Sequence, residues 1–175
     1  MAEFAFASHV QVGPNRFRER YGLDFEDFEI GQVFKHRPGL TLSQQDNVEE
    51  AMDTLNQAML HFDESYAAKT EWKKPLMVST LTLQLLIGMG WKTFAKKLRI
   101  LGWADLTMTN PVFGGDTIYA ESEIKAKAEA PGNAECGKLT VVTKGFNQNG
   151  ALVCTMEYDL LIYKRGCAPF ERTNY

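Results

Sequence analysis

The chain has few cysteines, and they are not arranged as ligands. Its three cysteines, Cys136, Cys154 and Cys167, are far apart, and no Cys-x-x-Cys pair occurs. Zinc sites and thioredoxin-like redox motifs use such pairs, so we expect neither a metal nor a redox cofactor. An odd number of scattered cysteines is also typical of a reducing compartment, and we expect the protein to be cytoplasmic.

The chain also has no excess of basic residues. Its 19 Lys and Arg against 22 Asp and Glu give a net charge of −3. A nucleic-acid-binding protein usually carries a basic stripe, so we expect no nucleic-acid partner. The first twelve residues have no basic start and no long apolar core, which argues against a secretory leader.

Only one long stretch, residues 75–91, is free of charged residues. It is about the length at which a membrane span becomes possible. Serine, threonine and glutamine interrupt it, however, and lysines flank it on both sides. We interpret it as a buried helix with no membrane partner, because helices that are apolar all round also occur inside globular domains. The helix is predicted to run from about Val78 to about Phe94 or Lys97.

Extended segments fill the second half of the chain. Within one of them Ile118 and Ile124 lie on one side while Tyr119 and Lys125 lie on the other, which is the alternation of a half-buried strand. Turn residues separate the segments, and Asn149-Gly150 is expected to supply positive-φ residues for a tight hairpin. The pattern predicts an antiparallel meander. The predicted strands are 99–110, 116–128, 135–147 and 151–164.

The first half is predicted to be mostly helical, with two short extended pieces at Val33–His36 and Leu40–Leu42. Ser43 and Asp46 begin a helix that runs to about Thr54. We interpret the acids of this helix as a solvated face rather than an acid–base pair. Asp63 is the expected N-cap of a further short helix, in preference to a catalytic role. The apolar positions of the first helix recur at helical spacing: Val48, Ala51, Met52 and Leu55.

A helix that is apolar nearly all round must be covered on most sides, and a strongly curved antiparallel sheet meets that need. The predicted fold class is therefore α+β: one hot-dog domain over residues 23–165, with the sheet wrapped round the long helix. An N-terminal arm (residues 1–22) is expected to lie over the surface, and residues 166–175 are expected to be a loose tail. Free sheet edges invite pairing, so a homodimer or higher homo-oligomer is predicted.

The run from Asn56 to Asp63 contains the candidate base, His61. An imidazole has an ordinary pKa of about 6.5 and can accept a proton near neutral pH. Of the other two histidines, His9 lies in the weakly patterned arm, and His36 is expected to be exposed because charged residues flank it. A lone histidine among apolar neighbours is more often structural than catalytic, so the residues by themselves leave both interpretations open.

Asn56 and Ser79 are the other candidate site residues. Asn56 lies five residues before His61; it can hold a water molecule by donating and accepting hydrogen bonds, or serve as a turn or cap residue. Ser79 lies at the start of the long helix, where unpaired N–H groups and the helix dipole favour negative charge. Its backbone N–H, with that of Val78 or Thr80, is our candidate oxyanion hole. Simple helix capping by Ser79 is compatible with this role.

The segment from Asn56 to Asp63 resembles the active-site segment of MaoC-like acyl-CoA hydratases. Common members read roughly Asp-x-Asn-Pro-x-His-x-Asp, followed by a loop, Pro, and His-Gly at the start of the central helix. This chain keeps His61 and Asp63, has Asn56 in place of the usual catalytic aspartate, and has Val78-Ser79 in place of His-Gly. These departures are similar to the active half of mesaconyl-CoA hydratases (β-methylmalyl-CoA dehydratases).

The resemblance covers residues 24–164 and includes a Pro-x-x-x-Gly-Asp-Thr turn at 111–117. It implies a hydratase or dehydratase that acts on the 2,3 double bond of a short enoyl-CoA. The substrates that it suggests, such as mesaconyl-CoA or itaconyl-CoA, have a branched or dicarboxylic acyl group. It also implies that His61 is the only base, that Asn56 orients the water, and that the backbone at Ser79 polarises the thioester carbonyl. The CoA thioester is the substrate, and no further cofactor is implied.

Two other functions remain open at this point. Hot-dog thioesterases often use an acid on or near the central helix, and this chain has none from Val78 to Gly90. A non-catalytic acyl-CoA-binding dimer would also explain the loss of the usual aspartate and of His-Gly. Mesaconyl-CoA hydratases usually carry two hot-dog halves in one chain, so two copies of this chain would have to stand in for them.

Overall fold

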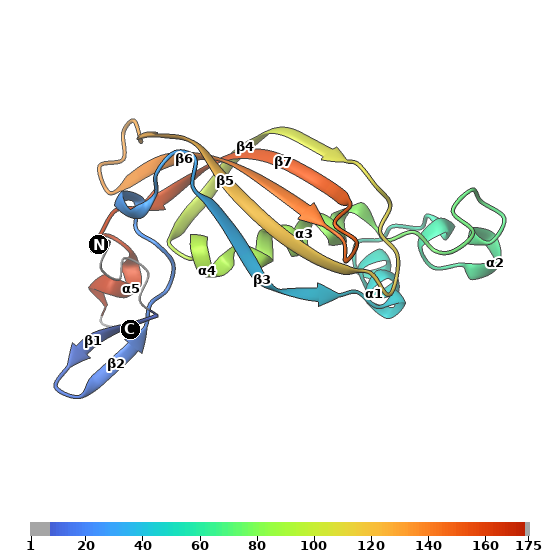
Figure 1. Ribbon diagram of the computed structural model, residues 1–175, viewed down its shortest axis with the longest axis horizontal. Coiled ribbons are helices and arrows are strands. Elements are labelled where there is room, and N and C mark those ends of the chain that lie inside the picture. Colours follow the sequence, from blue (N-terminus) through green and yellow to red (C-terminus); the bar gives the residue numbers. More distant parts are fainter. Residues whose placement is uncertain (1–7, 174–175) are drawn as a thin grey trace.

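The computed structural model describes residues 8–173, and an antiparallel sheet of five strands forms its centre. The sheet curves over helix α3 (Ser79–Met89), as Figure 1 shows. This arrangement agrees with the predicted α+β hot-dog architecture. In spatial order the strands are β3 (Val33–Thr41), β5 (Thr117–Glu129), β6 (Cys136–Phe146), β7 (Leu152–Tyr163) and β4 (Lys97–Met108).

The strand order departs from the predicted meander at β4. Strands β5, β6 and β7 follow one another as expected, but β4 pairs with β7 at the far edge, and β3 takes the place beside β5. The two short extended pieces that were predicted at Val33–His36 and Leu40–Leu42 are joined in a single strand, β3, which ends at Thr41. Its register shifts between His36 and Leu40, where Pro38 has no N–H to donate to the ladder.

The hairpin turn between β6 and β7 uses only one positive-φ residue. Gly150 has a φ of 76°, whereas Asn149 is not in the left-handed region. The Asn147 side chain organises the turn instead, because its Oδ1 accepts the N–H groups of Asn149 and Ala151 at 3.0 Å each. The turn position was predicted correctly, but the conformation expected for Asn149 was wrong.

The long helix predicted from Val78 onward is divided at Gly90 into α3 and α4 (Trp91–Phe94). Leu86 of α3 is 1% exposed and lies on Gly145 of β6, where a Cβ atom would come within 2.7 Å of the leucine side chain. The sheet of one chain covers only one side of α3, because Leu81, Leu85 and other apolar side chains of this helix stay partly exposed. No helix within residues 8–173 is long and apolar enough to cross a membrane.

Between β3 and α3 the chain forms a lobe that extends beyond the sheet (Figure 1). Both predicted caps are confirmed, since Ser43 Oγ accepts the N–H of Asp46 at 3.1 Å and Asp63 Oδ1 accepts that of Tyr66 at 2.9 Å. The predicted apolar face of the first helix is confirmed at Ala51, which is fully buried. It is wrong at Met52, which is 48% exposed, and at Leu55, which lies beyond the helix. The lobe contains α1 (Gln44–Asp53), a 3-10 turn (Met59–His61) and α2 (Glu64–Ala67).

The first and last described segments of the chain lie together at the opposite end of the molecule (Figure 1). Where an arm or short helix was expected, β1 (His9–Gly13) and β2 (Arg16–Glu19) form a hairpin. The described part of the predicted loose tail is packed instead: it contains α5 (Pro169–Arg172), and the ring of Phe170 meets that of Tyr21 edge-on at 5.7 Å. Residues 1–7 and 174–175, which include the start of the predicted arm, lie outside the described residues.

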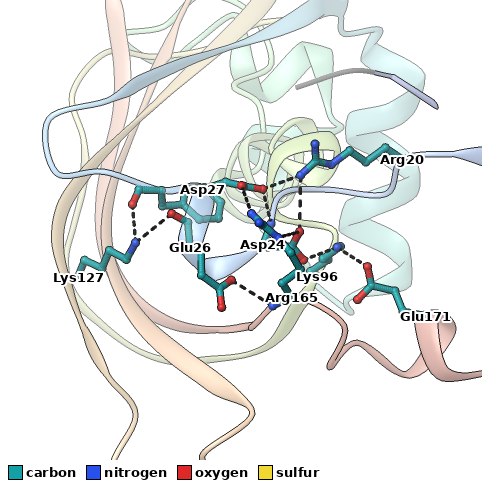
Figure 2. Close-up of polar contacts among 9 residues, drawn as sticks. Arg20, Asp24, Glu26, Asp27, Lys96, Lys127, Arg165 and Glu171 are labelled. Atoms are coloured by element: carbon teal, nitrogen blue, oxygen red, sulfur yellow. Dashed lines mark hydrogen bonds and ion pairs between the residues drawn. The ribbon is translucent and has the colours of Figure 1, made fainter. Parts of the chain in front are cut away.

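A buried ion cluster joins these ends to the sheet. Lys96 and Asp24 are each 4% exposed and form an ion pair, and the Lys96 ammonium also binds Glu171 Oε1 of α5 at 2.6 Å (Figure 2). Arg20 and Arg165 both bind the neighbouring Asp27 carboxylate at 2.6 Å. The cluster therefore holds together three segments that are far apart in the sequence.

His36 is buried, in contrast to its predicted exposure. It is 4% exposed, and its Nε2 lies 2.8 Å from Ser122 Oγ. The chain of hydrogen bonds continues from Ser122 to Thr143 Oγ1 at 2.7 Å and on to Tyr158 Oη at 3.1 Å, so it crosses β3, β5, β6 and β7. Successive strand side chains point to opposite faces, so the exposed Lys35 was a sign that His36 points inward.

This burial predicts a loss of stability in mild acid. Burial, and secondarily the Arg37 charge, lower the pKa of His36 to about 4, against a weaker opposite effect of Glu121. The unfolded chain, with a histidine pKa near 6.5, therefore binds a proton at a higher pH than the folded chain. The free energy of unfolding should be greatest above pH 6.5 and fall by about 2–3 kcal/mol as the pH drops toward 4.

Urea unfolding at several pH values between 7 and 4.5 measures this effect. His36→Gln cannot take up a proton in this range and should reduce the pH dependence. His9→Gln, at an exposed position on β1, is the matched control and should leave it unchanged. An equal pH dependence in all three proteins would mean that His36 is not its source.

Candidate active site

A cavity of about 220 Å³ opens beside the first turn of α3. Most of its wall is apolar, with Trp72, Met77 and Val112 among the lining side chains, and Ser79 and Thr82 of α3 contribute hydroxyl groups. The backbone holds this wall in place, because Met77 N–H donates to Val112 O at 2.9 Å. Within residues 8–173, no group of three or more His, Cys, Asp or Glu side chains is placed to hold a metal ion.

His61 lies next to this cavity wall. Its Nδ1 is 2.8 Å from the backbone oxygen of Leu76, a residue that lines the cavity. A carbonyl oxygen can only accept, so the hydrogen of the neutral imidazole is on Nδ1 and the lone pair is on Nε2. Leu76 is three residues before Ser79, so this contact places the predicted base beside the segment that leads into α3. The second nitrogen of the imidazole remains able to accept a proton.

Asn47 of α1 holds this arrangement together. Its side chain is fully buried. Its Nδ2 donates to the backbone oxygens of His61 at 2.8 Å and Leu76 at 3.0 Å, and its Oδ1 accepts the N–H of Val78 at 2.7 Å. One amide therefore connects the histidine turn with the start of the central helix. No motif in the sequence pointed to Asn47; the only signal was an amide one residue before Val48, at the edge of the predicted apolar stripe.

The first turn of α3 leaves two N–H groups available. Val78 is its N-cap, and its own N–H is taken by Asn47 Oδ1, so the expectation that Val78 contributes to an oxyanion hole is not supported. Within the described residues, the N–H groups of Ser79 and Thr80 have no acceptor, whereas that of Leu81 donates to Val78 O at 3.1 Å. Ser79 and Thr80 therefore present the unpaired positive end of the helix.

Asn56 has the geometry of a turn residue. It follows Leu55, which has a φ of 55°, and its Oδ1 accepts the N–H of Ala58 at 3.1 Å. The described structure contains no hydrogen bond between Asn56 and His61. The turn role is thus observed, and the Nδ2 group of Asn56 and the second lone pair of its Oδ1 remain available to hold a water molecule.

Other cavities and basic residues lie away from these groups. A cavity of about 490 Å³ adjoins the ion cluster, where Arg20, Asp24 and Lys96 line it, but its lining does not include His61, Asn56 or Ser79. Basic residues at the entrance of an acyl-CoA site can bind the phosphates of CoA, and Lys96 is one of the lysines that flank the long helix. Its burial between Asp24 and Glu171 excludes that role in this structure.

A family model for mesaconyl-CoA hydratase matches residues 6–170. The chain belongs to the mesaconyl-CoA hydratase family. The β-methylmalyl-CoA dehydratase of Chloroflexus aurantiacus is 28% identical over 157 residues, which are 81% of this chain and 45% of the dehydratase. The (R)-specific enoyl-CoA hydratase of Aeromonas caviae is 34% identical over 98 residues, which are 56% of this chain and 69% of that protein.

Solved structures confirm the hot-dog fold of this mesaconyl-CoA hydratase family member. A MaoC domain protein dehydratase from Chloroflexus aurantiacus has a TM-score of 0.77 and 26% identity, covering 82% of this chain and 45% of that one. A Mycobacterium tuberculosis protein described as having a double hot-dog fold has a TM-score of 0.75 and 24% identity, covering 82% and 44%. The chain thus spans about half the length of these two proteins and of the Chloroflexus β-methylmalyl-CoA dehydratase.

Proposed function

We propose that this protein adds or removes water across the 2,3 double bond of a short enoyl-CoA. The observation that carries the proposal is the His61 imidazole, whose Nδ1 is 2.8 Å from Leu76 O. This contact leaves Nε2 basic and ties His61 to Leu76, which lines the cavity together with Ser79 of α3. The family model and the named activity of the Chloroflexus dehydratase support the same reaction class.

In the proposed mechanism the thioester oxygen accepts hydrogen bonds from the N–H groups of Ser79 and Thr80, which draws electrons away from C3. His61 Nε2 takes a proton from water while the water oxygen bonds to C3. The electrons of the double bond move toward the thioester and form an enolate. The protonated imidazole then returns the proton to C2, and Asn56 Nδ2 donates to the attacking water and orients it. Dehydration follows the same steps in reverse.

The size of the cavity favours a short acyl chain. Its volume of about 220 Å³ is below the range of about 300–1,000 Å³ that is usual for drug-sized ligands. A four- or five-carbon acyl group, branched or dicarboxylic as in mesaconyl-CoA or itaconyl-CoA, fits such a space. The three cysteines are all unpaired, which supports our further proposal that the protein works in a reducing compartment such as the cytoplasm.

The exposed edge strand β4 supports a homodimer. Residues 101–110 are all exposed in the single chain, and Leu101, Trp103 and Leu106 are each 45–48% exposed. A long apolar edge of this kind invites pairing with another strand. The longer relatives contain about twice the matched segment, so a second copy of this chain is the partner that we propose for the β4 edge.

The dimer proposal predicts a mass in solution of about twice 19.7 kDa. Leu106→Lys, on the β4 edge, should give a monomer, because pairing would bury the new charge. Val33→Lys is the matched control: Val33 is 54% exposed on the opposite edge strand, β3, and this variant should remain a dimer. Sedimentation equilibrium measures both masses, and an unchanged mass for Leu106→Lys would contradict pairing through β4.

The proposed reaction is tested with a panel of enoyl-CoA esters, including crotonyl-CoA and mesaconyl-CoA. Hydration removes the conjugated thioester, so its ultraviolet absorbance should fall after the protein is added. Loss of absorbance without release of free CoA thiol would support a hydratase. If no ester in the panel changed and the protein still bound acyl-CoA, the non-catalytic binder would be the better description.

Glu50 favours a second candidate, a thioesterase. No acid lies on α3, but Glu50 of α1 reaches it, and its Oε1 accepts from Thr80 Oγ1 at 3.1 Å and Gln84 Nε2 at 2.8 Å. A carboxylate next to the central helix can activate water for attack on a thioester. A thiol reagent distinguishes the two reactions, because only a thioesterase releases free CoA. Release that is lost in Glu50→Gln would replace the hydratase proposal.

A further inference from the structure

The buried amide of Asn47 is bonded to the backbone at three points around the candidate base. The residue is 0% exposed. Its Nδ2 donates to His61 O and Leu76 O, and its Oδ1 accepts the N–H of Val78. A buried polar network with all its partners is rigid, and the loss of one member leaves the others unpaired away from water. The local structure around His61 therefore depends on this one side chain.

The backbone oxygen of Leu76 is shared between Asn47 and His61. It accepts from Asn47 Nδ2 at 3.0 Å, and it lies 2.8 Å from His61 Nδ1. A carbonyl oxygen has two lone pairs, so it can accept both hydrogens at once. Asn47 thereby fixes the position of the oxygen that the imidazole uses as its acceptor.

The tautomer of His61 depends on that oxygen. The hydrogen bonds of the two ring nitrogens determine which of them carries the hydrogen of a neutral imidazole. Within residues 8–173, the contact to Leu76 O is the one hydrogen bond of this ring. A backbone oxygen, and not a carboxylate, therefore keeps the hydrogen on Nδ1 and the lone pair on Nε2.

Asn47 also fixes the backbone that carries the imidazole. His61 O accepts from Asn47 Nδ2 at 2.8 Å and from Gln44 Nε2 at 2.7 Å. On its other side, Asn47 Oδ1 accepts the N–H of Val78 at 2.7 Å, so the free N–H groups of α3 begin at Ser79. One side chain thus relates the position of the base to the start of the central helix.

We infer that Asn47 is a positioning residue: it holds Leu76 O so that His61 keeps its hydrogen on Nδ1 and its lone pair on Nε2. This inference rests on the proposed function, since it takes His61 as the base. Asn47 acts only through its neighbours, because it is fully buried. A reacting group that is displaced by about 1 Å can lose about a hundredfold in rate. Loss of Asn47 should therefore lower kcat and leave substrate binding nearly unchanged.

The tautomer can be measured without any substrate. Nitrogen-15 NMR distinguishes protonated from unprotonated imidazole nitrogens. The chain has three histidines, so His9→Gln and His36→Gln identify the signals of His61. At alkaline pH the wild type should carry the hydrogen on Nδ1, whereas Asn47→Leu should show a mixture of both tautomers. Asn47→Ala, which also removes the amide, is the second variant if Asn47→Leu does not fold. A wild type with the hydrogen on Nε2 would overturn the inference before any variant is made.

The kinetic test compares the loss of two different amides. With an enoyl-CoA that the wild type hydrates, Asn47→Leu should lower kcat by about 10- to 100-fold and change KM by less than about threefold. Gln44→Leu is the matched control, because it removes a bond to the same His61 oxygen but leaves Leu76 O bonded to Asn47. It should keep the Nδ1–H tautomer and most of kcat. Equal losses of kcat in the two variants would argue against the role of Leu76 O.

Together the two measurements separate this inference from the proposed function. If no enoyl-CoA is hydrated but the tautomer of His61 changes in Asn47→Leu, the reaction is wrong and the positioning of the imidazole stands. If hydration occurs and Asn47→Leu keeps both kcat and the tautomer, Asn47 has no role in positioning the base. A fall in kcat with an unchanged tautomer would refute the inference as well, since Asn47 would then act by another route.

Discussion

Replacing His61 with asparagine should abolish hydration and leave the fold intact. The asparagine amide can still donate to Leu76 O, which now accepts from His61 Nδ1 at 2.8 Å, but it has no basic nitrogen to take a proton from water. A positioned general base contributes about 10²–10⁴-fold to a rate, so kcat should fall by at least about a hundredfold. Stopped assays with any enoyl-CoA that the wild type hydrates measure this loss.

Three further variants separate chemistry from folding. His61→Ala removes both the base and the hydrogen bond, so it should lose the same activity and about 1 kcal/mol of stability. Asn56→Ala should reduce kcat less, about tenfold, because Asn56 only orients the water in our mechanism. Gln57→Ala, at an exposed neighbouring position, should behave as the wild type. More than a tenth of wild-type activity in folded His61→Asn would rule out His61 as the base.

Replacing Lys96 with methionine should destabilise the protein by about 1.5–3 kcal/mol. Methionine fills a similar volume but leaves the Asp24 carboxylate, which is 4% exposed, with only its longer contacts to Arg20 at 3.6 Å and Arg165 at 3.4 Å. The contact to Glu171 of α5 is lost as well. Because the buried carboxylate loses its shortest charged hydrogen bond, both the urea midpoint and the melting temperature should fall.

An exposed ion pair is the matched control for this prediction. Lys125 and Glu123 are 2.7 Å apart on β5, and the lysine side chain is 46% exposed. Lys125→Met should therefore change the free energy of unfolding by no more than about 1 kcal/mol. The double variant Lys96→Met/Asp24→Asn should recover part of the loss, since the buried carboxylate charge is removed together with its ammonium partner. Similar effects of Lys96→Met and Lys125→Met would show that burial does not determine the importance of the pair.

The sequence by itself determined the features that depend on neighbours along the chain. Alternation along β5, the caps at Ser43 and Asp63, and the position of the turn at Gly150 were all predicted, because side-chain periodicity and capping are local effects. The same local pattern located the free N–H groups at Ser79. The resemblance of the segment around His61 to one family added the expected reaction.

The tertiary structure alone decided which distant residues meet. Three features depend on contacts between segments that are far apart in the chain. Strand β4 pairs with β7, and His36 is buried against Ser122. Asn47 bonds both His61 and Val78. No local period distinguishes a polar side chain that finds such a partner from one that faces water. For the same reason, only the folded chain showed that Lys96 pairs with Asp24 and that, among the described residues, the Thr82 hydroxyl has no partner.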